Sequence, residues 1–110
     1  MTVAQLAQTN GFKTATCPDP EREINGVYIG DLLSWVMGKA NEGDAWITIM
    51  SNINTIAVAA LKDTACIILA EDVVLEPEIL KTAQEKCINV LLSSLSAYEI
   101  SKILISKGIE

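Results

Sequence analysis

Polar residues that could bind a small molecule follow several apolar runs of this 110-residue sequence. Their hydroxyl, amide and carboxylate groups donate or accept hydrogen bonds, and each stands where an apolar run gives way to a helical pattern. Because the carboxyl ends of parallel strands share one edge of a sheet, where helix N-termini also point, we expect these residues to gather at that edge. The candidate ligand-binding residues are Gly30, Asp31, Ser51, Asn52, Asn54, Ser93 and Ser94.

The segment Ser51 to Asn54, which reads SNIN, has two interpretations. Asparagine is among the best N-terminal caps of a helix, and an apolar helical pattern begins at Ile53, so Asn52 can be a cap. The alternative is a pocket in which this segment binds a ligand together with Ser93 and Ser94. One segment can serve both purposes, so both interpretations stay open.

Patterns typical of catalysis are absent from the sequence. It contains no histidine, no phosphate-binding glycine loop and no nucleophile elbow. Glu71 and Asp72 are adjacent carboxylates, but two oxygen ligands without a third favour a solvated loop over a cation site. We therefore expect no catalytic residue, no metal and no cofactor. The alternative is an accessory subunit with phosphotransfer or other enzymatic activity that uses Ser51, Ser93 or Asp72.

The composition restricts the partners and the compartment. The formal charge is −6 and the eight lysine and arginine residues are scattered, so binding to nucleic acid is not expected. Every apolar run ends well short of the roughly 20 residues that span a membrane. Three cysteines without a close pair argue against disulfides and favour the cytoplasm. Cys66 and Cys87 fall within apolar patterns and are predicted to be buried, whereas Cys17 is predicted to meet solvent.

The order of apolar and polar segments predicts one α/β domain over residues 1–110. Strands are expected over residues 12–16, 24–29, 46–50, 66–70 and 88–92. Helix starts are predicted at the capping residues Thr2, Asp31, Asn52 and Ser96 and at Pro77. From residue 46 onward strands and helices alternate with short connections. This rhythm predicts a three-layer fold, with a mainly parallel sheet of about five strands and helices on both faces.

Two apolar features concern the surface. The helix that begins near Ile53 is predicted to be buried all round, because small apolar residues fill the side opposite its main apolar stripe. Trp35 lies off the apolar stripe of its own helix and is expected to be exposed. Exposed tryptophans are common in protein interfaces, and half of all residues here are hydrophobic. We therefore expect a homodimer with Trp35 as an interface residue.

Two long segments resemble the DRTGG domain family, namely VYIGDLLSWVMGKANEGDAWITIMSNINTIAVAAL and CIILAEDVVLEPEILKTAQEKCINVLLSSLSAYEISKIL. The resemblance covers roughly residues 24–109 and rests on the GDLLS segment, the strand, polar turn and helix at WITIMSNIN, and the closing pattern. Members of the family occur as stand-alone small proteins, as regulatory inserts between CBS domains of some inorganic pyrophosphatases, and within some phosphate acetyltransferases. Their fold is similar to the non-catalytic N-terminal domain of HPr kinase/phosphorylase.

The resemblance implies a stand-alone, non-catalytic module for regulation or dimerisation. Similar small proteins accompany redox and signalling enzymes in anaerobic bacteria, which implies a protein partner of that kind. Together with the polar strand ends, this gives the expected function: a regulatory or interaction module that binds a small metabolite or nucleotide. The sequence departs from the family at Ser51 to Asn54, which lack the Asp-Arg pair of the naming motif, and at Ala70-Glu71-Asp72, where a turn of small residues is usual.

Overall fold

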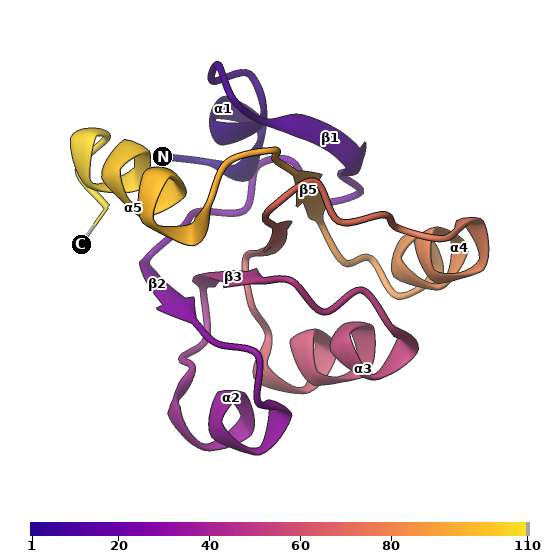
Figure 1. The fold of residues 1–110 in the computed structure, drawn as a ribbon. Helices are drawn as coiled ribbons and strands as arrows, with labels where there is room; N and C mark the ends of the chain where they lie inside the picture. Colours follow the sequence, from indigo (N-terminus) through magenta and orange to yellow (C-terminus); the bar gives the residue numbers. More distant parts are fainter. Residues whose placement is uncertain (110) are drawn as a thin grey trace.

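The computed structural model describes residues 1–109, which form a five-stranded sheet and five helices (Figure 1). The helices are α1 (Val3–Ala7), α2 (Leu33–Lys39), α3 (Ile53–Lys62), α4 (Pro77–Glu85) and α5 (Ala97–Ser106). The strands are β1 (Lys13–Thr16), β2 (Gly26–Ile29), β3 (Asp44–Thr48), β4 (Cys66–Leu69) and β5 (Val90–Leu92). The predicted α/β class with five strands is confirmed. No helix within residues 1–109 has the length and apolarity needed to cross a membrane.

The sheet is mixed, which corrects the prediction of a mainly parallel sheet. Its strand order is β1-β5-β4-β3-β2. The strands β2 to β5 run parallel to their neighbours, whereas β1 pairs antiparallel with β5. The reason is the connection over residues 17–25, which contains no crossover helix. The connection stays at the end of the sheet where the parallel strands begin. The strand β1 therefore ends where β2 begins, so it must run in the opposite direction.

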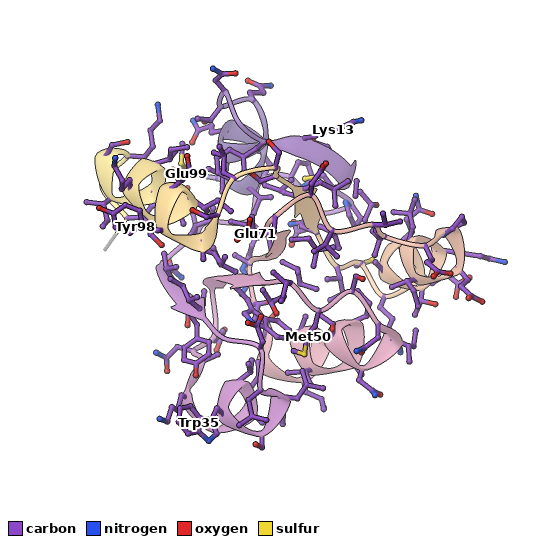
Figure 2. All side chains as sticks on the ribbon, in the orientation of Figure 1. Lys13, Trp35, Met50, Glu71, Tyr98 and Glu99 are labelled. Atoms are coloured by element: carbon purple, nitrogen blue, oxygen red, sulfur yellow. The ribbon has the colours of Figure 1, made fainter. Side chains whose placement is uncertain are left out.

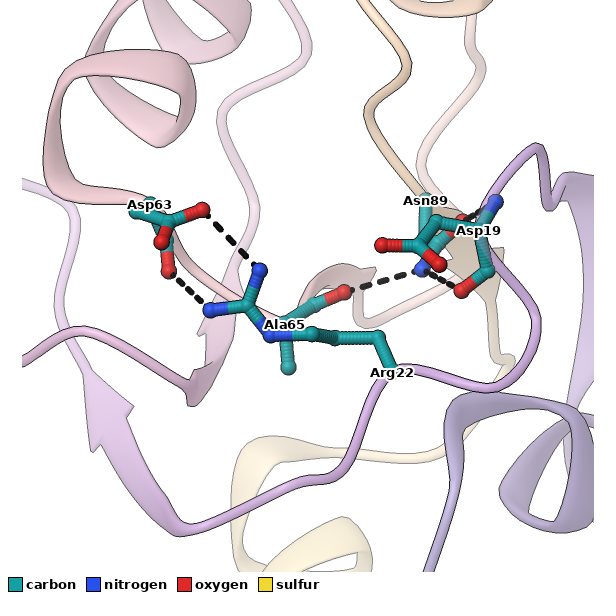
Figure 3. Close-up of polar contacts among 5 residues, drawn as sticks. All are labelled: Asp19, Arg22, Asp63, Ala65 and Asn89. Carbon is teal, nitrogen blue, oxygen red and sulfur yellow. Dashed lines mark hydrogen bonds and ion pairs between the residues drawn. The ribbon is translucent and has the colours of Figure 1, made fainter.

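The 17–25 connection crosses the whole N-terminal edge of the sheet. Four strand spacings of about 4.8 Å separate β1 from β2, or roughly 19 Å, and nine extended residues reach about 30 Å. The buried side chain of Asn89 holds this connection (Figure 3). Its Oδ1 accepts from the Asp19 amide at 2.9 Å, and its Nδ2 donates to the carbonyls of Asp19 and Ala65 at 2.7 and 3.0 Å. One amide side chain thus joins the connection to the start of β4.

An ion pair holds the next part of the same connection. Arg22 donates from Nη1 to Asp63 Oδ1 at 3.0 Å and from Nη2 to the Asp63 carbonyl at 2.9 Å (Figure 3). The hydrogen bond from the guanidinium lowers the pKa of the Asp63 carboxyl below its ordinary value. Because Asp63 follows α3 in a left-handed conformation, this pair also satisfies a carbonyl at the end of that helix.

Helices cover both faces of the sheet, and successive strand residues point to opposite cores. Ile47 and Ile68 face one core, to which α1 and α5 contribute. Trp46 and Ile67 face the other core, to which α2, α3 and α4 contribute. The three helices that connect the parallel strands therefore share one face, as same-direction crossovers between sequential neighbours require. Figure 1 shows the first and last helices on the other side of the sheet.

The helix α3 is exposed on its outer side, so the prediction that it is buried all round is wrong. Ile56 and Ala59 are buried against the sheet, whereas Ile53 and Leu61 are 47% and 73% exposed. The sequence carries apolar residues on both sides of this helix. Only one side can face the sheet, and α2 and α4 flank the helix without covering its outer surface.

The cysteines follow the prediction only in part. Cys66 is fully buried as expected, and burial raises the pKa of its thiol to about 12. Cys17 is half-buried. Cys87 is exposed, which corrects its predicted burial. It follows α4 with φ +58°, a left-handed conformation that turns the chain out of the helix and carries the side chain off the apolar face.

Candidate functional site

The C-terminal edge of the parallel strands carries the candidate residues. The strand register places the ends of β2, β3, β4 and β5 side by side, with Ile29 opposite Ile47 and Leu69 opposite both Thr48 and Leu92. The polar segments that follow these strands therefore lie along one edge of the sheet. What each side chain does there depends on its hydrogen bonds.

Asp31 joins two strand ends instead of capping α2. Its Oδ1 accepts from Thr48 Oγ1 at 2.7 Å and from the Ile49 amide at 3.0 Å. The N-cap of α2 is Leu32, which makes no side-chain capping bond, so the predicted helix start at Asp31 is wrong by one residue. The competing acceptor role explains this, because a carboxylate that reaches the neighbouring strand is no longer available to the first turn of its own helix.

Asn52 caps α3, as the first interpretation of the SNIN segment predicts. Its Oδ1 accepts from the amides of Asn54 and Thr55 at 2.9 and 3.2 Å. The side chains of Ser51 and Asn54 make no hydrogen bond within residues 1–109 and remain available to a ligand, although the structure leaves the ligand interpretation open. Helix α3 thus begins at a polar turn with free side-chain groups on either side of the cap.

Ser93 is buried, and its hydroxyl group both donates and accepts a hydrogen bond. Its Oγ donates to the Gly11 carbonyl at 2.8 Å and accepts from the Leu95 amide at 3.1 Å. It is 4% exposed, so it positions the 93–95 turn rather than facing solvent. The neighbouring Ser94 is exposed and makes no hydrogen bond within the described chain.

Three hollows divide the C-terminal edge. The α4 hollow, of about 350 Å³, is lined by Ser51, Asn52, Glu76, Glu78 and Ile79. The β5 hollow, of about 330 Å³, is lined by Gly11, Phe12, Lys13, Asp72, Val73, Leu92, Ser93 and Ser94. The central hollow, of about 200 Å³, is lined by Ile29, Asp31, Ile47, Thr48, Ile49, Ala70, Glu71 and Ala97. The structure therefore places the SNIN segment and the serine pair in different hollows, and Gly30 and Asn54 line none of the three.

Carboxylates dominate the electrostatics of this edge. The α4 hollow contains two glutamates, the central hollow Asp31 and Glu71, and the β5 hollow Asp72 beside Lys13. In Figure 2, Glu71 lies over the middle of the molecule, whereas Lys13 points outward from β1. Within residues 1–109 no three His, Cys, Asp or Glu side chains gather to hold a metal ion. Such an edge attracts hydrogen-bond donors and cations and repels a bare phosphate.

Thr48, Glu76 and Glu78 are lining residues that sequence reasoning missed. Thr48 is 2% exposed and connects Asp31 to the next turn, because its Oγ1 also accepts from the Met50 amide at 3.2 Å. A signal was present, since Thr48 is the single hydroxyl residue in the otherwise apolar run from Ala45 to Met50. The two glutamates gave no such signal, because only the packing of α4 beside α3 brings them to the SNIN segment.

The profile of the DRTGG domain family matches residues 7–106, which is almost the entire described chain. The chain belongs to the DRTGG domain family. No curated protein matches the sequence. In this DRTGG domain the SNIN segment forms the cap of α3. Glu71 and Asp72 both have φ +61°, the left-handed region that favours glycine.

A solved structure has a similar fold. It contains the CBS and DRTGG domains of the regulatory region of Clostridium perfringens pyrophosphatase, complexed with the activator diadenosine tetraphosphate. The TM-score is 0.68 at 14% identity, and the match covers 86% of this chain and 41% of that chain. This DRTGG domain therefore spans less than half of that protein chain, and at such identity the likeness establishes the fold alone.

Proposed function

We propose that this DRTGG domain is a non-catalytic regulatory module that binds a small ligand at the C-terminal edge of its sheet and acts as a homodimer. The observation that carries the proposal is the family match over residues 7–106. A DRTGG domain occurs in the solved regulatory region that binds a nucleotide activator. The family resemblance also suggests a redox or signalling enzyme as the partner that the module controls.

The described side chains support a binding role over a catalytic one. The chain has no histidine, and the Ser93 hydroxyl is engaged on both sides by backbone groups. Burial, together with the nearby Asp19 carboxylate, raises the pKa of the Cys17 thiol, and burial raises that of Cys66 to about 12. Neither thiol is therefore activated as a nucleophile. All three cysteines are free, which fits a reducing compartment such as the cytoplasm.

The charge of the edge favours one class of ligand. Carboxylates line every hollow, so a nucleoside or another metabolite with several hydrogen-bond donors fits better than a polyphosphate. A nucleotide would bind here with a divalent cation that offsets the charge of Asp31, Glu71 or Glu76. The free side chains of Ser51 and Ser94 supply neutral contacts within the hollows, and that of Asn54, two residues after Asn52, supplies one outside their lining.

The homodimer is supported by the surface around α2. Trp35 is 57% exposed and projects outward from the helix (Figure 2), and Lys39 Nζ lies 4.1 Å from the centre of its ring. Leu32, one turn earlier, is 56% exposed. Large aromatic and aliphatic side chains that are exposed on the single chain are typical of protein interfaces.

A ligand panel tests the binding proposal. We would measure the melting temperature with nucleosides, nucleotides and diadenosine tetraphosphate, each with and without Mg²⁺, and expect at least one to raise it. Amide chemical shifts recorded with that ligand should change at residues 29–31, 48–54, 70–72 or 93–94, and not at Asn89 on the opposite edge. Turnover of the ligand, or shifts confined to the opposite edge, would contradict the proposal. A panel without any stabilising compound would count against it too.

A further inference from the structure

The free edge of β2 lies between two exposed apolar flanks. Within residues 1–109 the strand is the last in the sheet and pairs only with β3. On the α5 side, Ile29 and Ile105 are 51% and 64% exposed, and on the α2 side Leu32 and Trp35 are 56% and 57% exposed. Figure 1 shows the open side of β2 between these two helices. Exposed apolar groups that form a contiguous region mark an interaction site.

An apolar groove runs beside this edge. It has a volume of about 500 Å³ and lies between β2 and α5. Among residues 1–109 its lining contains no charged residue, although the chain as a whole carries a charge of −6. The lining residues are Val27, Tyr28, Ile29, Ser101, Leu104, Ile105 and Ile109.

The two edge strands of the sheet differ in their protection. Natural edge strands avoid pairing with other chains by carrying lysine or proline or by containing a bulge. The strand β1 begins with Lys13, and its register with β5 shifts between Thr14 and Thr16. The strand β2 reads GVYI, has an uninterrupted register with β3, and contains neither lysine nor proline. Of the two edges, only that of β2 is left open to another strand.

We infer that the edge of β2 is the docking surface for a second copy of this chain. The two β2 strands pair antiparallel about a twofold axis and extend the sheet to ten strands, while α5 packs on its symmetry mate on one face and α2 on the other. The inference rests on the homodimer in the proposed function and names its surface. It is independent of the ligand at the C-terminal edge.

The area that a stable interface needs favours a second copy over a single peptide strand. A specific interface buries about 800 Å² on each partner, out of a total surface of 5770 Å² for the chain. A four-residue strand edge cannot supply that area alone. Only a partner with apolar side chains on both faces of its strand covers both flanks. A twofold axis meets this need, because it places the α5 flank of one copy against the α5 flank of the other, and likewise the α2 flanks.

The charges near the edge of β2 are compatible with a twofold axis. Two copies of a chain with a charge of −6 repel each other, and the described lining of the groove brings no like charges into the contact. The helix α5 carries Glu99 in its first turn and Lys107 just after its last. Because the axis runs the two α5 helices antiparallel, the acidic start of one helix faces the basic end of the other.

The variant Ile105→Lys tests this surface. It places two ammonium groups at the twofold contact, so the dissociation constant of the dimer should rise about 100-fold or more in sedimentation velocity. Leu61→Lys is the matched control, because Leu61 is 73% exposed on α3, away from β2. The control should remain dimeric. Circular dichroism and the urea midpoint, both measured on dilute protein, should show that the two variants are folded.

Hydrogen exchange supplies a second measurement on the unaltered chain. Amides within residues 26–29 should become more protected as the protein concentration rises, and Ile105→Lys should abolish this concentration dependence. A monomeric wild type, equal dissociation of both lysine variants, or a dimer whose 26–29 amides gain no protection would overturn the inference. Ile105 lines none of the three hollows, so ligand stabilisation measured on Ile105→Lys shows separately whether the ligand-binding proposal holds.

Discussion

At the residue scale, the polar groups of the C-terminal edge divide into those that hold the backbone and those that remain free. Asp31, Asn52 and Ser93 each accept a hydrogen bond from at least one backbone amide. The side chains of Ser51 and Asn54 make no hydrogen bond within residues 1–109. A substitution in the first group should therefore change stability, and one in the second group should change only ligand binding.

The pair Asn52 and Asn54 separates these two roles. Asn52→Ala removes the cap of two amides and should lower the free energy of unfolding by about 0.5–2 kcal/mol. Asn54→Ala should leave the free energy of unfolding nearly unchanged and weaken the ligand found in the panel. Urea denaturation and titration calorimetry measure the two effects. Equal destabilisation by both changes, with no effect on binding, would make the segment purely structural.

The buried thiol of Cys66 predicts a loss of stability at high pH. Its pKa is raised to about 12 by burial, against about 8.5 in an unfolded chain. Between these values the unfolded state binds fewer protons than the folded state, so the free energy of unfolding falls as pH rises, by up to about 1.4 kcal/mol per pH unit. Below about pH 8.5 this contribution is complete.

Cys66→Ala provides the comparison. Its urea midpoint should be lower than that of the wild type at pH 7, because a buried sulfur is lost, but should fall less steeply between pH 8 and 10.5. The two proteins differ in this one side chain, so the difference between the two slopes isolates the thiol. Parallel slopes would show that Cys66 does not stay protonated in the folded state.

At the element scale, local signals predicted the helix starts and tertiary contacts decided the rest. The capping boxes at Thr2 and Ser96 are present as the sequence indicates, because their partners lie three residues away. The start at Asp31 failed because its carboxylate bonds to Thr48 instead. The outward side of α3 was equally unpredictable. The helix α3 has apolar residues on all sides, including Leu61, so the periodicity of its sequence does not indicate which side packs on the sheet.

In the candidate site, too, some features could be predicted from the sequence and others depend on tertiary contacts. The strand ends could be placed at one edge because parallel crossovers dictate it, and the cap at Asn52 followed from residue type. The separation of the SNIN segment from the serine pair could not be predicted, because it depends on β4 lying between β3 and β5. The antiparallel β1 was missed for a similar reason: nothing in residues 17–25 shows that this stretch crosses the sheet.

The connection between β1 and β2 provides a prediction at this scale. Asn89→Ala removes three hydrogen bonds and leaves the buried Ala65 carbonyl and the part-buried amide and carbonyl of Asp19 without this partner, so it should cost at least about 2 kcal/mol. Arg22→Ala breaks a pair whose carboxylate is largely exposed and should cost about 1 kcal/mol or less. Chemical denaturation of both variants checks the order. A larger effect at Arg22 would show that the ion pair, and not the amide, holds the connection.

At the scale of the whole molecule, net charge should control self-association. Each chain carries −6, so two copies repel at low ionic strength. At 0.5 M salt the Debye length falls to about 4 Å, and the apolar contact around β2 is then opposed by less repulsion. The dissociation constant in sedimentation velocity should therefore fall as NaCl rises from 20 to 500 mM. A dimer that weakens with salt would instead indicate an interface held by ion pairs.

The pairing of the first strand with the last has a consequence for biosynthesis. The strand β1 is complete at Thr16, but its partner begins only at Val90. At 5–20 residues per second the ribosome needs roughly 4 to 15 s to make the segment between them. Burial of Val3 and Leu6 of α1 is delayed further, because the core that contains them also requires Leu104 from α5. The elements α1 and β1, which are made before the other helices and strands described here, are thus among the last to fold, and a chain stalled before α5 would offer these side chains to chaperones rather than to a core.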